Sequence, residues 1–141
     1  MNRHFLRALV AACSCLWAGL AGADVVVVVA ANNPVASLTA EQVAQIFLAK
    51  SVAFPGGGAA APVDQEESSA EFTQFYSKVT GKDAAQLKSY WSQLVFTGKA
   101  QRPPKAAGNA AVKKAVAEKP GAIGYIDAGA VDGTVKVVLK P

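Results

Sequence analysis

The chain has 141 residues, with 14 Lys or Arg against 10 Asp or Glu, a formal net charge of +4, and 52% hydrophobic residues. Its positive residues form no run longer than Lys113-Lys114 after the N-terminus, so the electrostatic footprint of a nucleic-acid-binding protein is missing. Both cysteines, Cys13 and Cys15, lie near the N-terminus, which excludes a disulfide framework and a thiolate metal site in the remainder.

The N-terminus shows the order of features of a secretory signal peptide. Residues 1–7 hold two arginines and no acidic residue, and residues 9–20 are apolar and uncharged. Residues 21–23 read Ala-Gly-Ala, which is a small-residue cleavage sequence. We therefore predict a cleaved signal peptide at residues 1–23 and localisation to the periplasm.

The mature protein is then residues 24–141, the length of one domain. Loss of Arg3 and Arg7 leaves 12 positive residues against 10 acidic ones, so its charge is near +2. No apolar run of membrane-spanning length follows residue 23, and we expect no stable membrane insertion after cleavage. The sequence ending at Cys13 faintly resembles a lipoprotein box, which keeps lipidation of Cys13 open as an alternative.

Hydrophobic patterns predict strands and helices in alternation along the mature chain. A continuous β-branched run is typical of a strand covered on both faces, and apolar residues at helical spacing indicate amphipathic helices. The expected strands are residues 25–31, 61–64, 122–126 and 134–139. The expected helices begin near residues 39, 68, 83 and 109. This order predicts an α/β fold with a mostly parallel or mixed central sheet flanked by helices.

Capping residues mark where the expected helices begin. The expected N-caps are Thr39, Ser68, Asp83 and Asn109. Gln42 completes a capping box with Thr39, and Glu71 does the same for Ser68. The apolar stripes on these helices are predicted to face the core: Val43, Ile46 and Phe47; Phe72, Phe75, Tyr76 and Val79; Leu87, Tyr90, Trp91, Leu94 and Val95.

Two stretches of the chain resemble the second lobe of the periplasmic phosphate-binding proteins that serve ABC transporters. The more specific one is the string Pro-Gly-Ala-Ile-Gly-Tyr at residues 120–125, which follows the expected fourth helix. The other runs from Leu38-Thr39 through residues 62–64 to Phe75-Tyr76 and Trp91. The resemblance implies a single lobe of the type II-like binding-protein fold.

In that family, an oxyanion is held in a cleft between two lobes that close around it. The sequence here has room for one lobe, and it shows no counterpart of the family's first-lobe phosphate loop. The resemblance therefore implies a phosphate-like ligand, and it implies that a second copy or another protein supplies the other wall of the cleft. An ABC transporter permease or a sensor protein is the implied partner.

The resemblance places the anion site at the expected helix start near Ser68 and Ser69, with Gln65 close by. Free N–H groups and the positive end of a helix dipole attract anions there. In the family, the second lobe also offers the anion an arginine. That arginine has no match in this sequence, because Asp64 or Gln65 stands near its place. Carboxylates surround the helix start and repel a dianion, so the alternative stays open that Ser68 only caps its helix. These carboxylates belong to Asp64, Glu66, Glu67 and Glu71.

Four further residues are candidates for contact with the anion. Lys99 and Arg102 lie in the loop that precedes the fourth helix, and Asn109 stands at the start of that helix. Asn32 follows the first strand, at a carboxyl end where open α/β sheets often bind ligands. Each also has a plainer interpretation, which is solvated charge for Lys99 and Arg102, helix capping for Asn109 and a turn for Asn32.

The sequence does not point to an enzyme. Its only histidine, His4, and both cysteines lie in the expected signal peptide, so Ser–His, Cys–His and histidine–metal chemistries are excluded from the mature chain. We expect no catalytic residue, no metal and no cofactor. A third hypothesis beside solute binding and catalysis is a periplasmic interaction or scaffold module that has kept the lobe fold without a ligand.

Overall fold

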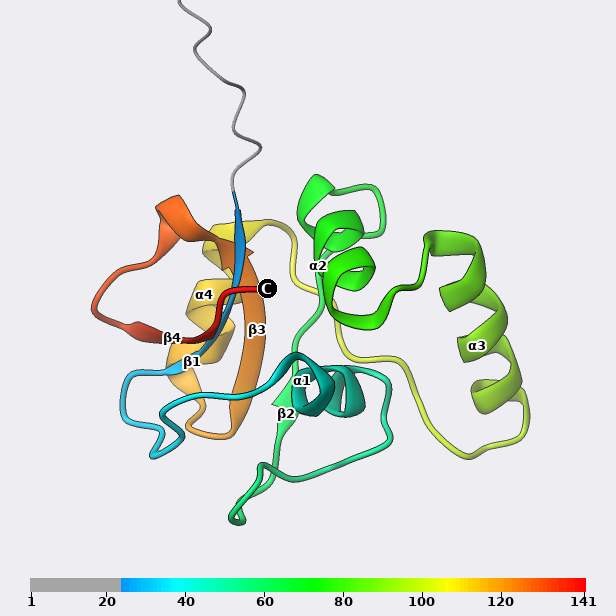
Figure 1. Ribbon diagram of the computed structural model, residues 1–141, viewed down its shortest axis with the longest axis horizontal. Helices are drawn as coiled ribbons and strands as arrows, with labels where there is room; N and C mark the ends of the chain where they lie inside the picture. Colours follow the sequence, from blue (N-terminus) through cyan, green and yellow to red (C-terminus); the bar gives the residue numbers. More distant parts are fainter. Residues whose placement is uncertain (1–23) are drawn as a thin grey trace, which may run out of the picture.

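The computed structural model describes residues 24–141, and the predicted signal peptide and Cys13 lie outside these residues. One mixed sheet has the strand order β2-β3-β1-β4 (Figure 1). Its strands are β1 (Val25–Ala30), β2 (Ala61–Pro62), β3 (Ala122–Asp127) and β4 (Val135–Leu139). β2 runs parallel to β3, whereas β1 is antiparallel to both β3 and β4. The predicted α/β fold with a mixed sheet and flanking helices is confirmed.

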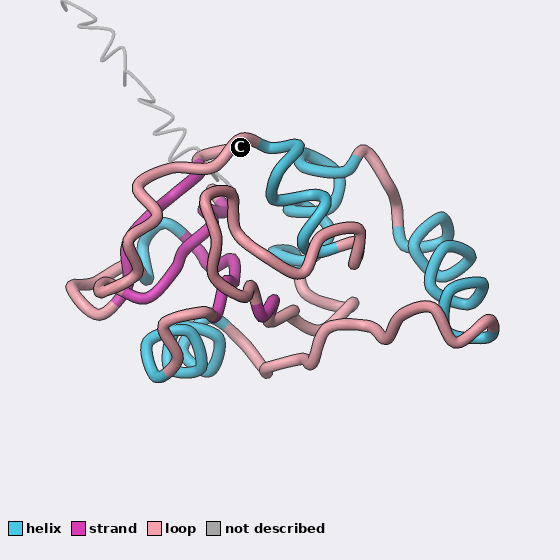
Figure 2. The backbone as a smooth tube through the Cα atoms, turned by 90° about the horizontal axis from the view of Figure 1, so that it is seen from below, coloured by secondary structure: helices cyan, strands magenta, loops and turns pink. Residues whose placement is uncertain are grey.

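Both faces of the sheet are covered, which explains the continuous apolar sequence of β1. Val25, Val27 and Val29 belong to one hydrophobic cluster, and Val26 and Val28 belong to another on the opposite face. Helices α1 (Ala40–Phe47), α2 (Ala70–Thr80) and α3 (Ala84–Phe96) contribute to the first cluster. Helix α4 (Asn109–Glu118) covers the second face, and Figure 2 shows it on the other side of the strands.

Local sequence signals set the ends of several helices. The Thr39–Gln42 capping box at the start of α1 is present, and Asp83 forms a second capping box with Gln86 at the start of α3. Gly81 ends α2 in the left-handed conformation with φ 69°, which glycine adopts without steric cost. The predictions that Thr39 and Asp83 cap these helices are therefore confirmed.

Two predicted caps lie one residue from their actual positions. The N-cap of α2 is Ser69 rather than Ser68, and its Oγ accepts a hydrogen bond from the Phe72 N–H at 3.1 Å. Because the third helical residue is then Phe72, Glu71 cannot complete the predicted capping box. Helix α4 has Gly108 as its N-cap, and Asn109 is its first residue, so the prediction that Asn109 is the cap was wrong.

β2 is shorter than the predicted strand of residues 61–64. Its regular pairing with β3 ends at Pro62, and Asp64 forms an isolated parallel bridge with Lys105 on the other side. The chain thus changes partner within three residues. This change brings the connection between α3 and α4 alongside the end of β2.

Helix α3 projects from the body of the molecule beyond the core (Figure 1). Leu87 and Trp91 are buried as predicted, but Val95 in the last turn is 50% exposed and Phe96 is 92% exposed. The prediction that Val95 faces the core was wrong, because the last turn of α3 extends past the residues that α3 packs against.

Gly124 allows helix α4 to pack directly on β3. A Cβ atom at this position would lie 2.7 Å from Val112 Cγ1 and 2.9 Å from Val116 Cγ2, both on α4. We expect Gly124→Ala to push α4 from the sheet and to lower the free energy of unfolding by about 1–3 kcal/mol, measured by urea denaturation.

Gly129→Ala is the matched control, because a Cβ there meets nothing within 4 Å. Equal stability losses in the two variants would show that the close approach at Gly124 is not what limits packing.

Candidate functional site

The candidate site lies at the edge of the sheet where β2 and β3 end. Because these strands are parallel, their carboxyl ends meet at one edge, where open α/β sheets commonly place ligands. Asp64 and Gln65 follow β2 there, and Asp127 is the last residue of β3. The start of α4 lies at the same edge, since Gln65 and Asp127 both contact Asn109. The start of α2 lies there too, since Asn109 donates to Glu71 in the first turn of α2.

Asp64 is the buried centre of this edge, with only 2% of its surface exposed. Its Oδ2 accepts a hydrogen bond from the Tyr76 hydroxyl at 2.6 Å. Its Oδ1 accepts one from the Tyr125 hydroxyl and another, at 3.0 Å, from the Gln65 N–H. Asp64 therefore joins the end of β2 to α2 through Tyr76 and to β3 through Tyr125.

Burial raises the pKa of the Asp64 carboxyl above its usual value of 3.8, and the hydrogen bonds from Tyr125 and Tyr76 offset this only in part. The pKa values of both tyrosines are raised as well, because burial and the neighbouring carboxylate disfavour a phenolate. Both hydroxyls thus remain protonated donors. The ring of Tyr125 stacks on Phe75 with centroids 4.0 Å apart, which fixes its direction.

The backbone of Asp64 also fixes the loop that carries the basic residues. The Asp64 N–H donates to the Pro104 carbonyl at 2.8 Å, and the Ala106 N–H donates to the Asp64 carbonyl at 2.9 Å. This pairing places Arg102 and Lys105 next to residues that follow β2. Arg102 forms an ion pair with Glu67, and Lys105 Nζ lies 3.6 Å from the same Glu67 oxygen.

Gln65 is 1% exposed and connects the end of β2 to α4. Its Nε2 donates to the Tyr125 carbonyl at 2.9 Å and to Asn109 Oδ1 at 3.0 Å. Asn109 Oδ1 also accepts from the Asp127 N–H at 3.1 Å, and Asn109 Nδ2 lies 3.3 Å from Glu71 Oε1. The buried amide of Gln65 is thus mainly structural, because it holds α4 against the end of β2.

The start of α2 is the part of this edge that an anion can approach. Ser68 is exposed, and the first N–H groups of a helix have no partners within it. Ser69 satisfies one of them, that of Phe72, and its hydroxyl donates to the Glu66 carbonyl at 2.8 Å. Hydrogen bonding to Arg102 lowers the pKa of Glu67, so this carboxylate remains ionised beside the helix start.

Five of the seven predicted ligand-binding residues come together at this edge, and two do not. Those that come together are Gln65, Ser68, Ser69, Arg102 and Asn109. Asn32 follows β1, whose antiparallel direction puts it at the opposite edge, where Asn33 donates to the Pro120 carbonyl. Lys99 lies in the turn after α3, with its N–H bonded to the Leu94 carbonyl, and Figure 1 shows that turn far from the start of α2.

Sequence reasoning missed the buried carboxylate with its two tyrosines and the ion pairs of Glu67. Tyr76 and Tyr125 were expected only as parts of the core and of a family motif, and their hydroxyls carried no pattern that pointed to Asp64. The pairing of Glu67 with Arg102 and Lys105 depends on the loop bridge at Asp64, which no local pattern indicates.

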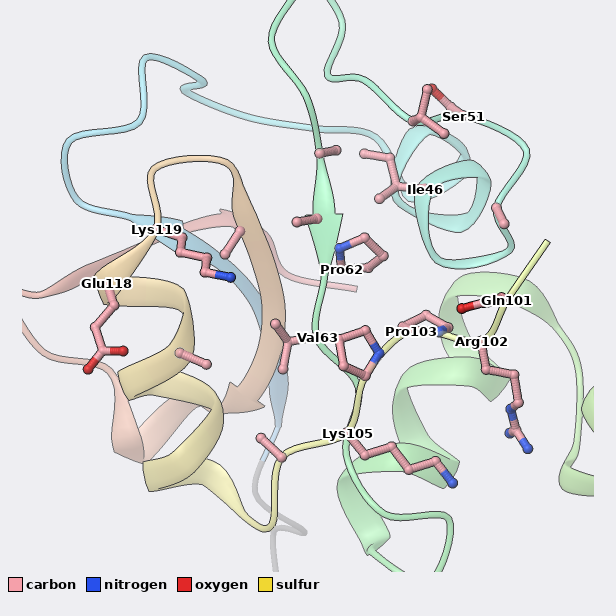
Figure 3. Close-up of a pocket in the computed structure, with 18 residues that line it drawn as sticks. Ile46, Ser51, Pro62, Val63, Gln101, Arg102, Pro103, Lys105, Glu118 and Lys119 are labelled. Atoms are coloured by element: carbon pink, nitrogen blue, oxygen red, sulfur yellow. The ribbon is translucent and has the colours of Figure 1, made fainter.

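A cavity of about 530 Å³ borders this site along the outer edge of β2 (Figure 3). Apolar residues of α1, of β2 with the residue after it, of α4 and of the loop between α3 and α4 form much of its lining, including Ile46, Val63, Pro103 and Pro104. In Figure 3, Arg102 and Lys105 lie at its rim, and their side chains extend to the side on which α2 lies. The apolar lining does not suit an anion, so we locate the candidate anion site at the start of α2.

Within residues 24–141, no group of three His, Cys, Asp or Glu side chains has an arrangement that could hold a metal ion. No helix in the same residues is long and apolar enough to cross a membrane.

Comparison with solved structures identifies the architecture around this site. Over 82% of its length, the chain is similar to a protein from Clostridium perfringens described as a phosphate ABC transporter substrate-binding protein, solved with bound phosphate (26% identity, TM-score 0.67). It is similar over the same share to an ABC-type phosphate transport receptor from Vibrio cholerae (23% identity, TM-score 0.66). PstS from Borrelia burgdorferi shares the fold at 15% identity, with a TM-score of 0.57.

The chain spans 44% of the Clostridium protein, 45% of the Vibrio protein and 46% of the Borrelia protein. The predicted resemblance to one lobe of a periplasmic-binding-protein-type fold is therefore confirmed. The sequence matches no protein-family model and no curated protein.

We expect Asp64→Ala to lower the free energy of unfolding by about 2–4 kcal/mol, because two buried hydroxyls lose their acceptor. Asp64→Asn should cost less, since it keeps one acceptor oxygen and a tyrosine oxygen can accept from its amide. Urea denaturation at neutral pH measures both losses.

The same measurement across pH separates charge from hydrogen bonding. The raised pKa means that the folded protein holds the Asp64 proton more tightly than the unfolded chain does. The contribution of Asp64 to stability therefore falls as pH rises from 3.8 to that raised pKa, and it is constant above it. Asp64→Asn should lack this slope, and a stability difference between the two proteins that does not vary with pH would contradict the assignment.

Proposed function

We propose that the chain is exported and that residues 24–141 form one lobe of a binding site for phosphate or a similar small oxyanion. The protein would deliver the bound anion to an ABC transporter or report it to a sensor. The observation that carries this proposal is the convergence of Arg102 and Lys105 on Glu67, next to the exposed start of α2. A guanidinium, an ammonium and a helix N-terminus in one place form an arrangement that favours phosphate.

Arg102 supplies the positive charge that the junction between β2 and α2 lacks. Asp64 or Gln65 stands near the place of the family's arginine, and both side chains are buried, Asp64 against its two tyrosine partners. Arg102 approaches from the connection between α3 and α4 instead, and its side chain is 31% exposed. An oxyanion at the start of α2 would accept from the Ser68 hydroxyl, from free N–H groups of the first turn and from Arg102.

The likeness to solved proteins supports the same ligand class. The Clostridium protein, at 26% identity, was solved with bound phosphate, and the Vibrio protein is a phosphate transport receptor. Because the present chain spans less than half of either protein, one lobe alone offers one wall of a cleft. We propose that a second copy or another protein supplies the opposite wall.

A second candidate function is an interaction module without a small ligand, acting as a periplasmic scaffold. Most polar groups at the sheet edge are already paired with one another: Asp64 with two tyrosines, Gln65 with Asn109, and Glu67 with Arg102 and Lys105. Among residues 24–141, the buried atoms Gln65 Oε1, Arg102 Nε and Asp127 Oδ1 at this edge have no hydrogen-bond partner. Glu66, Glu67 and Glu71 also add negative charge where an anion would bind. Under either function we expect no catalysis, and the titration below separates the two.

We expect inorganic phosphate to bind the purified protein with measurable heat by isothermal titration calorimetry. Arg102→Gln should weaken binding roughly tenfold or more, because it removes a charge-assisted hydrogen bond. Lys99→Gln is the control, since it removes the same charge from the same connection at a place far from α2. Ser68→Ala should weaken binding by a smaller factor.

Absence of heat and of a thermal shift at millimolar phosphate would contradict oxyanion binding and favour the interaction module. Equal weakening by Arg102→Gln and Lys99→Gln would mean that only the overall charge matters and that the site lies elsewhere.

Export is tested by the mass of the protein recovered from the periplasmic fraction of a bacterial host. We expect a chain that begins at Asp24, because cleavage after the Ala-Gly-Ala sequence leaves that residue first. A mass that retains residues 1–23, or one that carries a lipid on Cys13, would contradict the proposed cleavage.

A further inference from the structure

We infer that Glu67 is an intramolecular competitor of the bound anion, which holds Arg102 and Lys105 until an oxyanion displaces it. This inference rests on the proposed function and assigns to one residue the control of affinity at that site. It follows from the position of Glu67, from the groups that Glu67 binds and from the small net free energy of its ion pairs.

The loop that carries the two cations is positioned by backbone hydrogen bonds and not by Glu67. The Asp64 N–H and carbonyl pair with Pro104 and Ala106, so the loop between Arg102 and Lys105 is fixed beside the end of β2. Removing the Glu67 charge leaves these bonds in place. The cations would then remain beside the start of α2 without their carboxylate partner.

One oxygen of Glu67 serves both cations. Oε1 forms the ion pair with Arg102 and lies 3.6 Å from Lys105 Nζ. Glu67 directly precedes Ser68, so its carboxylate occupies the neighbourhood in which an anion at the helix start would meet the same cations. A carboxylate and a phosphate compete for a guanidinium because both accept its paired N–H groups in the same geometry.

The competing contact is weak enough to be exchanged. The side chains of Glu67, Arg102 and Lys105 are 45%, 31% and 29% exposed, so water screens their attraction. Exposed ion pairs of this kind contribute little net free energy. When a dianion displaces Glu67, the bonds of one carboxylate to Arg102 and Lys105 are lost. The dianion replaces them and also accepts hydrogen bonds from α2 N–H groups and from Ser68, so more bonds form than are broken.

Glu66 provides a matched comparison. It is an acidic neighbour of Glu67, its side chain is exposed, and it has no ion pair among residues 24–141. Neutralising Glu66 or Glu67 changes the net charge equally. Only the change at Glu67 releases Arg102.

The test is calorimetric titration of inorganic phosphate into the wild-type protein, Glu67→Gln and Glu66→Gln at low ionic strength. We expect Glu67→Gln to bind phosphate about 3- to 10-fold more tightly than wild type, with Glu66→Gln within about twofold of wild type. In the Arg102→Gln background, adding Glu67→Gln should bring little further gain. Thermal melting checks that each variant is folded.

The outcomes are distinguishable. If wild type binds phosphate and Glu67→Gln binds no more tightly than Glu66→Gln, the competitor role is overturned while oxyanion binding stands. If Glu67→Gln binds phosphate and wild type gives neither heat nor a thermal shift, the competitor role is supported, but phosphate binding by the wild-type protein fails. If none of the folded proteins binds phosphate, oxyanion binding fails and the competitor role fails with it. The Arg102 Nη2–H resonances supply an independent readout, because Nη2 forms the ion pair with Glu67 and these resonances should shift in Glu67→Gln without phosphate present.

Discussion

The side chain and backbone of Asp64 together join three separate parts of the chain at one edge of the sheet. Its side chain accepts from Tyr76 of α2 and Tyr125 of β3, and its backbone pairs with the loop between Arg102 and α4. A buried acid is costly unless hydrogen bonds satisfy it. Because these bonds fix the start of α2 and the path of the basic loop together, the position of every candidate anion-binding group depends on them.

Much of the fold could be predicted because short-range signals agree with long-range packing. The run of valines in β1 is buried on both faces, and the predicted caps Thr39 and Asp83 mark true helix starts. The errors occur where tertiary contacts decide. α2 begins one residue late, since Ser69 makes the cap, and Val95 is half exposed because nothing packs over the last turn of α3.

The candidate site could be predicted only in part. The serine-started helix and Gln65 are adjacent in sequence, so the resemblance locates them directly. Arg102 is distant in sequence, and it reaches Glu67 only through the pairing of its loop with Asp64, which sequence spacing does not reveal. Asn32 was predicted at the site and lies at the opposite edge. The carboxyl end of a strand marks the ligand edge of the sheet only if that strand runs parallel to its neighbours, and β1 does not.

The antiparallel direction of β1 has a consequence for assembly. Val25 lies opposite Asp127, and Leu139 of β4 lies opposite Val27, so the first and last described residues meet at the edge where β3 ends. Any polypeptide joined to Asp24 or to Pro141 would leave the lobe at this edge of the sheet, on which the start of α2 also lies. A partner tethered at either end would therefore need only a short linker to reach across the anion-facing surface. A bulky fusion at either end would obstruct that surface.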